Sequence, residues 1–283
     1  MAYFSSDRPG SARRTHRPGK RRVLSLLFAA QHLLEVLAAD AADVGLVGDA
    51  PFLFAYAGGA YIKAVHAAAS DQGGISTAIL VRKNSPIRNE ADLEGRKIAT
   101  GHGSIGHYFL LRVLKRAGLK PSDVTIVFLS PSNAKAAFAT GAIDAWSTWA
   151  PYLPMAERDD GARAIADGRG LLSGYGFEVA SAGALNTKRA LLEDYLKRLS
   201  RADLWAKAHP AEYAKALAQE TGLDPGIARR TVDLNLRMPR PLDAKVIAEE
   251  AEVLRHFHAA GAITAKPDIN AGFDTSFQYL DSP

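Results

Sequence analysis

The 283-residue sequence contains no cysteine and only three methionines. Without cysteine there is no thiol nucleophile, no cysteine-ligated metal and no redox dithiol. The sequence also has no uninterrupted apolar run near the length of about 18 residues that a spanning helix requires, so we expect a soluble chain. The G-x-S-x-G, H-E-x-x-H and P-loop motifs are missing as well. These absences predict a protein without catalytic residues, metal or cofactor.

Positive charge is in excess, but it is concentrated at one end of the chain. The formal net charge is +5, from 35 Lys and Arg against 30 Asp and Glu. Residues 1–22 hold seven of these bases, one acid and two Pro-Gly pairs, which is typical of a disordered, solvated tail. The rest of the chain has 28 basic and 29 acidic residues, so we predict no nucleic-acid partner.

The basic tail also has the outline of a targeting signal. It is followed by an apolar run over residues 23–30, and Arg21-Arg22 is similar to part of a twin-arginine signal. The apolar run is short and no convincing cleavage site follows it. These residues alone therefore do not predict export, and contact of the tail with nucleic acid or a membrane surface stays an open alternative.

From residue 22 onward, short β-type runs alternate with helical periods, which predicts an α/β fold with mostly parallel strands. After about residue 190 the pattern is helical only. The predicted strands are 23–28, 44–47, 76–82, 97–100, 125–129 and 179–184.

A glycine-rich segment between a predicted strand and an amphipathic helix is the most informative part of the sequence. It comprises Gly103, Ser104, Ile105, Gly106 and His107. Backbone N–H groups and the positive end of a helix dipole converge there, which favours an anion site. The alternative is a tight turn in which Ser104 serves only as N-cap. His107 is more simply a polar loop residue than a general base.

Aromatic residues could supply an apolar wall next to that anion site. Trp146, Trp149, Tyr175 and Phe177 are the candidates, although core packing is the simpler explanation of the tryptophans in isolation. Asp49, after Gly48 at a strand end, is either a ligand-reading carboxylate or the N-cap of the next helix. A sulfonate stays charged at biological pH and needs only neutral donors, so the pattern favours recognition of an oxyanion without reaction.

Several segments occur in the same order as in the aliphatic-sulfonate-binding proteins, which are periplasmic receptors of ABC importers related to taurine and nitrate receptors. The resemblance covers about residues 28–275. It implies a two-lobed type II periplasmic binding protein fold, a periplasmic location, a monomer, a sulfonate or related oxyanion as ligand and an ABC permease as partner. The matching segments are Val47–Pro51, Asn84–Ile87, Asp92–Ala99, Gly103-Ser104 with His107, Ala136–Phe138 and Gly141–Trp146.

The resemblance also implies a site and a division into lobes. Ser104, Ile105 and Gly106 would bind the sulfonate oxygens, beside Gly103 and His107. Gly48 and Asp49 would face them from the other lobe, with Trp146, Trp149 and Tyr175 at the walls. Lobe one would comprise 23–98 and 185–283 and lobe two 99–184, with crossings near Ala99 and Ala180. The first strand and helix of lobe one are expected to be missing.

Two other functions stay open at this point. One is a carbon–sulfur lyase of the same fold, similar to the desulfinases, but these rely on a cysteine nucleophile that this sequence lacks. The other is a sensory or partner-binding module without a role in transport.

Overall fold

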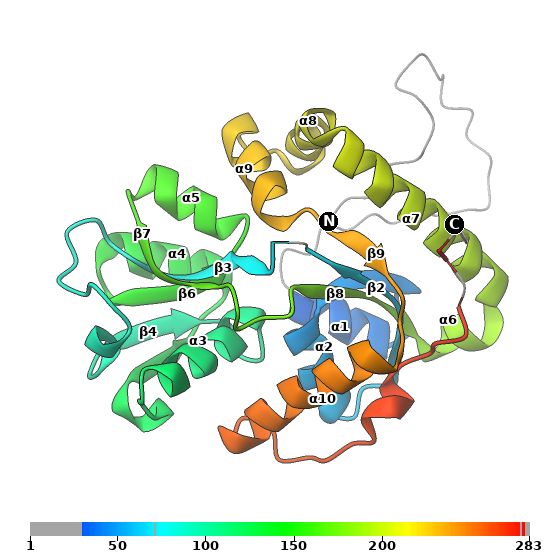
Figure 1. Cartoon of the computed structure of the whole chain (residues 1–283), viewed down its shortest axis with the longest axis horizontal. Coiled ribbons are helices and arrows are strands. Elements are labelled where there is room, and N and C mark those ends of the chain that lie inside the picture. Colours follow the sequence, from blue (N-terminus) through cyan, green and yellow to red (C-terminus); the bar gives the residue numbers. More distant parts are fainter. Residues whose placement is uncertain (1–29, 71, 278, 281–283) are drawn as a thin grey trace.

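The computed structural model describes residues 30–70, 72–277 and 279–280 (Figure 1). The expected basic tail over 1–22 and the expected strand over 23–28 lie outside the described residues. Two sheets, each with its own helices, lie beside one another (Figure 1). This is the predicted α/β arrangement with two sheets.

The smaller sheet has four strands, in the order β1-β8-β2-β9. The central strand β8 is antiparallel to both of its neighbours, so β1 and β2 run in the same direction. The strands are β1 (Val44–Gly48), β2 (Ile62–Ala69), β8 (Tyr175–Ser181) and β9 (Met238–Arg240).

The larger sheet has five strands, in the order β5-β4-β6-β3-β7. β4 is parallel to β5 and β6, while β3 is antiparallel to both of its neighbours. The predicted mostly parallel pairing therefore holds only around β4. Both β3 and β8 run antiparallel to the strands beside them. The strands are β3 (Gly74–Val81), β4 (Lys97–Thr100), β5 (Thr125–Phe128), β6 (Ala145–Trp149) and β7 (Arg163–Gly168).

Ten α-helices flank the sheets within the described ranges (Figure 1). None of them is long and apolar enough to cross a membrane. Their bounds are α1 (Ala30–Ala38), α2 (Asp49–Ala57), α3 (Ile105–Arg116), α4 (Pro131–Thr140), α5 (Tyr152–Asp159), α6 (Ala182–Thr187), α7 (Arg189–Ala208), α8 (Pro210–Thr221), α9 (Pro225–Asn235) and α10 (Ala244–Ala259).

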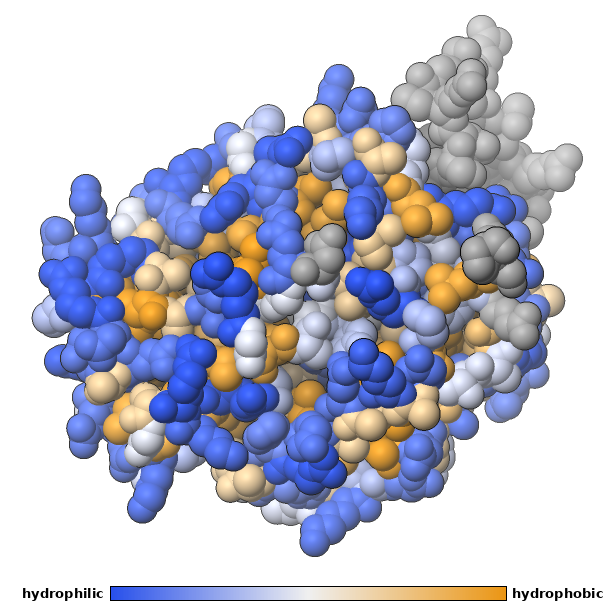
Figure 2. All heavy atoms as spheres, in the orientation of Figure 1, coloured by the Kyte–Doolittle hydropathy of each residue, from blue (hydrophilic) through white to orange (hydrophobic). Residues whose placement is uncertain are grey.

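Buried aromatic rings hold the helices to the smaller sheet. Phe52 of α2, Phe177 of β8 and Phe273 pack with ring centroids 5.4 to 5.7 Å apart. All three side chains are almost inaccessible to solvent, and burial of each contributes roughly 1.5–3 kcal/mol. The outer surface is mainly hydrophilic on the face seen in Figure 2, with apolar residues in small separate groups.

The chain passes between the two sheets twice, between β2 and β3 and again between β7 and β8. The two crossings contact each other, because the Ser70 N–H donates to the Gly174 carbonyl at 3.4 Å. The crossings expected near Ala99 and Ala180 are wrong, since these residues lie inside β4 and β8. Pairing of β3 with β6 and β7 is a long-range contact, which the local strand pattern does not encode. The predicted boundaries of 23–98, 99–184 and 185–283 therefore do not follow the sheets.

Candidate functional site

A cavity of about 970 Å³ lies between elements of the two sheets. On the side of the smaller sheet it is lined by α1, the end of β1 and parts of α2. On the other side it is lined by residues 101–105, residues 128–131 and Trp149. Because both sheets contribute walls, a ligand in this cavity would contact both halves of the molecule.

The N-terminus of α3 opens into this cavity. Ser104 is the N-cap, and its hydroxyl accepts a hydrogen bond from the His107 N–H at 3.2 Å while donating to the Gly101 carbonyl at 2.6 Å. Ile105 and Gly106 form the first turn, and their N–H groups have no hydrogen-bond acceptor among the described residues. The turn therefore presents two neutral donors at the positive end of the helix dipole.

The glycines of this loop allow a close approach of the chain to its neighbours. Gly103 has φ +65°, and a Cβ there would lie 2.8 Å from the Phe54 ring. A Cβ on Gly106 would lie 2.7 Å from the Ser147 carbonyl of β6. Glycine at 106 thus lets the first turn of α3 lie directly on the sheet.

His107 holds the loop but does not line the cavity. Its side chain is buried, and its Nδ1 accepts a hydrogen bond from the Gly103 N–H at 3.3 Å. Burial, with a smaller effect of the neighbouring His102, lowers the pKa of His107 to about 4. A neutral His107 with an accepting Nδ1 keeps the loop in place, although the residue lies buried in the first turn of α3 and not in the loop itself.

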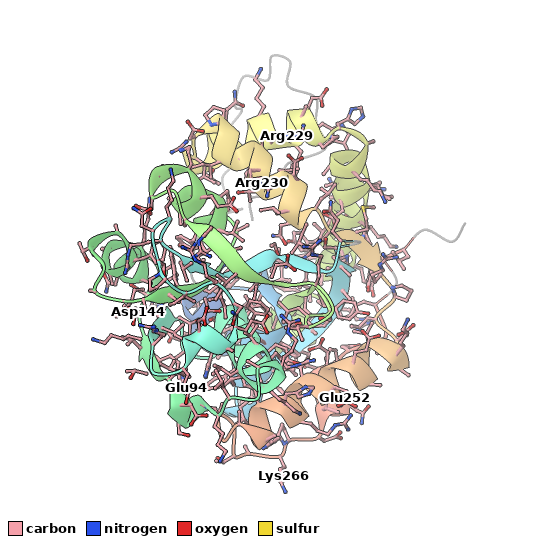
Figure 3. The ribbon with its side chains drawn as sticks, turned by 60° about the vertical axis from the view of Figure 1, so that its left-hand side comes forward. Glu94, Asp144, Arg229, Arg230, Glu252 and Lys266 are labelled. Carbon is pink, nitrogen blue, oxygen red and sulfur yellow. The ribbon has the colours of Figure 1, made fainter. Side chains whose placement is uncertain are left out.

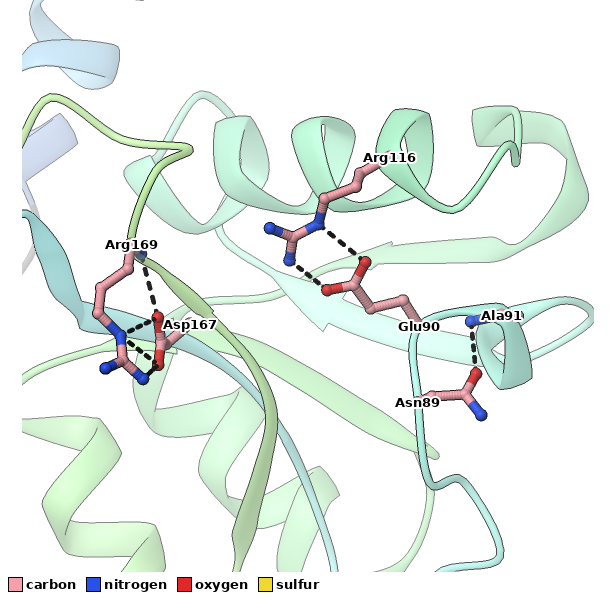
Figure 4. Close-up of polar contacts among 6 residues, drawn as sticks. All are labelled: Asn89, Glu90, Ala91, Arg116, Asp167 and Arg169. Atoms are coloured by element: carbon pink, nitrogen blue, oxygen red, sulfur yellow. Dashed lines mark hydrogen bonds and ion pairs between the residues drawn. The ribbon is translucent and has the colours of Figure 1, made fainter.

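At its other end, α3 is anchored by an ion pair. Arg116 in the last turn pairs with Glu90, which precedes β4 (Figure 4). A second pair, between Asp167 and Arg169, lies where β7 ends (Figure 4). Exposed pairs contribute about 0–1 kcal/mol each, so the Arg116–Glu90 pair orients α3 more than it stabilises the fold.

The two tryptophans of β6 have separate environments. Trp149 lines the cavity, whereas Trp146 is 1% exposed and packs against Phe138 of α4 with ring centroids 6.0 Å apart. Side chains three residues apart on a strand point to opposite faces of the sheet. The structure thus does not place Trp146 at the cavity wall where the sequence analysis expected it.

An aromatic group next to the loop forms a wall that the sequence analysis did not identify. His102 lies edge-on to Phe54 and Phe128, with ring centroids 4.8 and 4.7 Å apart, and all three line the cavity. Phe54 comes from α2 and Phe128 from β5. Only the tertiary fold brings them together, since no motif links these positions.

Of the residues expected on the opposite side, Gly48 lines the cavity but Asp49 does not. The Asp49 carboxylate is buried and accepts hydrogen bonds from the Ser173 hydroxyl at 2.7 Å and the Ala50 N–H at 2.6 Å. Burial raises its pKa, although these two hydrogen bonds and the charge of Arg237 act in the opposite direction. Asp49 thus links α2 to the second crossing. Gly48, and not Asp49, is the N-cap of α2.

Tyr175 also lies away from the cavity. It is partly buried at the start of β8 and stacks on Phe177, with ring centroids 6.0 Å apart. Burial, together with Glu249, raises the pKa of Tyr175 to about 12, so its hydroxyl stays protonated.

Arg237 is the only lysine or arginine that lines the cavity among the described residues. Its Nε donates to the Gly174 carbonyl at 3.3 Å. Burial and the charge of Glu178 raise the pKa of nearby Asp203 to about 7, while Arg237 lowers it. No sequence signal marks Arg237, because a single arginine after a helix is common. The described residues contain no group of three or more His, Asp or Glu that could hold a metal ion.

The chain is similar in sequence and structure to known proteins that share one family and one fold. Residues 29–213 match the NMT1/THI5-like family. A relative from Escherichia coli (strain K12) that carries the name of an aliphatic sulfonates-binding protein is 33% identical over 244 residues, which cover 85% of this chain and 75% of that protein. Among solved structures, the alkanesulfonate-binding protein SsuA from Xanthomonas axonopodis pv. citri, bound to MOPS, superposes with a TM-score of 0.80 at 35% identity, covering 87% of this chain and 84% of that one.

The fold also occurs in an enzyme. The desulfurization enzyme DSZB superposes with a TM-score of 0.63 at 20% identity, over 83% of each chain. At that identity the likeness concerns the fold alone.

Proposed function

The chain belongs to the NMT1/THI5-like family. We propose that it is the solute-binding component of an ABC importer. Its ligand is an aliphatic sulfonate or a related small organic oxyanion, bound in the cavity between the two sheets. Relatives named as sulfonate-binding proteins match most of the chain, which supports the proposal. A periplasmic location and a monomeric state belong to the same proposal.

The first turn of α3 is the observation that carries the proposal. Ser104 and Ile105 line the cavity, with Gly106 buried directly behind them, and the N–H groups of this first turn favour an anion that needs donors but no counter-ion. Arg237 adds a positive charge to the cavity wall, and Phe54, Phe128 and Trp149 surround the space that an organic group would occupy. Gly48 faces the same space from the smaller sheet.

We propose that the lobes follow the two sheets. One lobe then comprises residues 30–70 and 175–280, and the other 74–168. The two adjacent crossings serve as the hinge. Since the walls of the cavity come from both lobes, ligand contacts favour the closed conformation, which the permease recognises.

A single backbone N–H can be removed to test the anion site. Ile105 is the first residue of α3, where proline is tolerated, and Ser104 has the extended backbone, with φ −81° and ψ 169°, that precedes proline. We expect Ile105→Pro to weaken sulfonate binding about tenfold or more, as for loss of one hydrogen bond to a charged group.

The matched control is Ile105→Ala, which shortens the side chain but keeps the N–H. Isothermal titration calorimetry with ethanesulfonate, taurine, nitrate and sulfate would measure both variants. Equal loss of affinity in the two variants, or no binding of any of these anions to the parent chain, would contradict the proposal.

We propose binding without reaction. The sequence has no cysteine, and the described part of the cavity wall has no other nucleophile paired with a base. Mass spectrometry of a sulfonate recovered after long incubation with the protein should show the unchanged compound. Release of sulfite would instead favour the lyase alternative.

A further inference from the structure

A second compartment of about 190 Å³ adjoins the cavity. The two spaces have four lining residues in common, so the compartment lies directly behind this part of the cavity wall. These residues are Leu46, Trp149, Asn235 and Arg237. An engineered cavity of about 150 Å³ holds benzene, so this compartment has room for a small organic group.

The compartment is enclosed mainly by aromatic and aliphatic side chains. Trp149 and Tyr152 lie edge to face, with ring centroids 6.1 Å apart and planes at 89°. Tyr213 and Leu217 of α8 and Val232 of α9 complete this wall, and all three are buried. Such walls favour the organic part of a ligand over its charged head.

Two oxygen atoms in the compartment lack partners within the described part of the chain. The hydroxyl of Thr231 and the side-chain carbonyl of Asn235 are buried, line the compartment and have no hydrogen-bond partner among the described residues. They lie one turn apart on α9, while Arg229 and Arg230 of the same helix project to the outside (Figure 3). By contrast, the hydroxyl of Thr221, also in the lining, already donates to the Leu217 carbonyl.

Buried oxygens without partners are uncommon in folded proteins and unfavourable. A hydroxyl group on a ligand can partner both atoms, because it donates to a carbonyl oxygen and accepts from a hydroxyl. We infer that the ligand is a sulfonate with an extended organic tail, which passes Trp149 into this compartment, where its polar end donates a hydrogen bond to the Asn235 carbonyl and accepts one from the Thr231 hydroxyl. This inference rests on the proposed function, because the sulfonate head must occupy the first turn of α3.

Three sulfonates separate the head from the tail. Ethanesulfonate fills only the head site, while heptanesulfonate and 6-hydroxyhexanesulfonate have equal numbers of heavy atoms and differ in one hydroxyl. Titration calorimetry of the full chain should give tighter binding of both long compounds than of ethanesulfonate. The hydroxylated compound should bind about five- to tenfold tighter than heptanesulfonate, as expected for one hydrogen bond made in a dry site.

Thr231→Val removes the unpartnered hydroxyl without changing the size of the side chain. It should reduce the preference for 6-hydroxyhexanesulfonate and leave ethanesulfonate affinity as in the parent, because Thr231 lines only the second compartment. Thr221→Val is the matched control. Its hydroxyl is already bonded, so the preference should persist.

The outcomes distinguish failure of the inferred tail site from failure of the proposed function. If ethanesulfonate binds but the parent shows no preference for the hydroxylated tail, or if Thr231→Val keeps that preference, the inference is overturned and the proposed function stands. If no sulfonate binds at all, the proposed function fails and the inference fails with it.

Discussion

Ser104 organises the start of α3 with one side-chain oxygen. Its hydroxyl bonds the Gly101 carbonyl and the His107 N–H, so it contributes to the fold before any ligand arrives. A substitution here must therefore keep the cap if its effect on binding is to be interpretable. Aspartate and asparagine are both good N-caps and nearly identical in shape.

Ser104→Asp and Ser104→Asn form such a pair. In the aspartate variant a carboxylate faces the bound anion in a partly dry cavity, and like charges there cost several kcal/mol. We expect sulfonate affinity to fall about 100-fold or more relative to the asparagine variant. Titration calorimetry measures both affinities, and thermal unfolding checks that both variants keep the parent stability. Similar affinities would mean that the anion lies elsewhere.

Glu250 of α10 is a buried carboxylate without a hydrogen-bond partner among the described residues. Burial raises its pKa well above the usual value, and Asp49 and Glu249 add to the effect. A carboxyl group with a raised pKa in the folded state costs stability as the pH rises from the unfolded pKa through the folded one. At low pH the neutral form removes this cost.

Glu250→Met should therefore stabilise the protein in a pH-dependent way. We expect an increase in the free energy of unfolding of about 1–3 kcal/mol at pH 8, because folding there must either bury an unpaired charge or bind a proton to Glu250, and an apolar group of similar size has neither cost. Near pH 4.5 the increase should be much smaller. Urea unfolding at the two pH values measures it, and an equal change at both would show that packing, not charge, decides the effect.

At the scale of the elements, the contact of α3 with β6 positions the anion site. The Ser147 hydroxyl of β6 donates to the Gly106 carbonyl at 2.7 Å, so helix and strand are joined at the first turn. A Cβ on Gly106 would lie 2.7 Å from both the Ser147 carbonyl and the Thr100 hydroxyl. Because neither the backbone nor this buried hydroxyl can easily move, the helix itself would have to shift.

Gly106→Ala should destabilise the fold by about 1–3 kcal/mol, as overpacking does, and should also weaken sulfonate binding. Gly48→Ala is the control for stability. A Cβ at Gly48 would make only an ordinary contact of 3.5 Å with Pro51, and its φ of −72° suits alanine. Chemical unfolding compares the two variants. Equal stabilities would mean that α3 is free to adjust on the sheet.

The glycine loop could be predicted from sequence because its signal is local. Strand, glycines, N-cap and helix follow one another within some twenty residues, and β4 and α3 begin where this pattern predicts. The face that each tryptophan of β6 occupies also follows from strand periodicity, but the aromatic composition alone does not show it. Arg237 and Asn235 could not be predicted, because only long-range packing brings the end of α9 and the segment after it to the cavity.

At the scale of the whole molecule, the two crossings form a narrow connection rich in glycine. At the strand ends next to the crossings, Gly74 of β3 is paired with Gly168 of β7, and a Cβ on Gly168 would lie 2.3 Å from the Gly74 carbonyl. Gly73 and Gly174 have positive φ of 62° and 75°, which favours glycine. The close approach keeps the crossings together, so the proposed lobes can rotate about a single axis. Because the walls of the cavity come from both proposed lobes, such a rotation would change its width.

The absence of cysteine makes this motion measurable, because two introduced cysteines are the only labelling sites. Ala39→Cys, after α1, and Asn133→Cys, on α4, place exposed spin labels on opposite sides of the cavity. A saturating concentration of sulfonate should shorten the distance between the two spin labels, because ligand contacts with both walls favour the closed conformation. Pulsed electron–electron double resonance measures this distance. Lys120→Cys with Asn133→Cys labels one lobe only, and that distance should stay constant. An unchanged distance in the first pair, with ligand bound, would mean that the cavity binds its ligand without closure of the lobes.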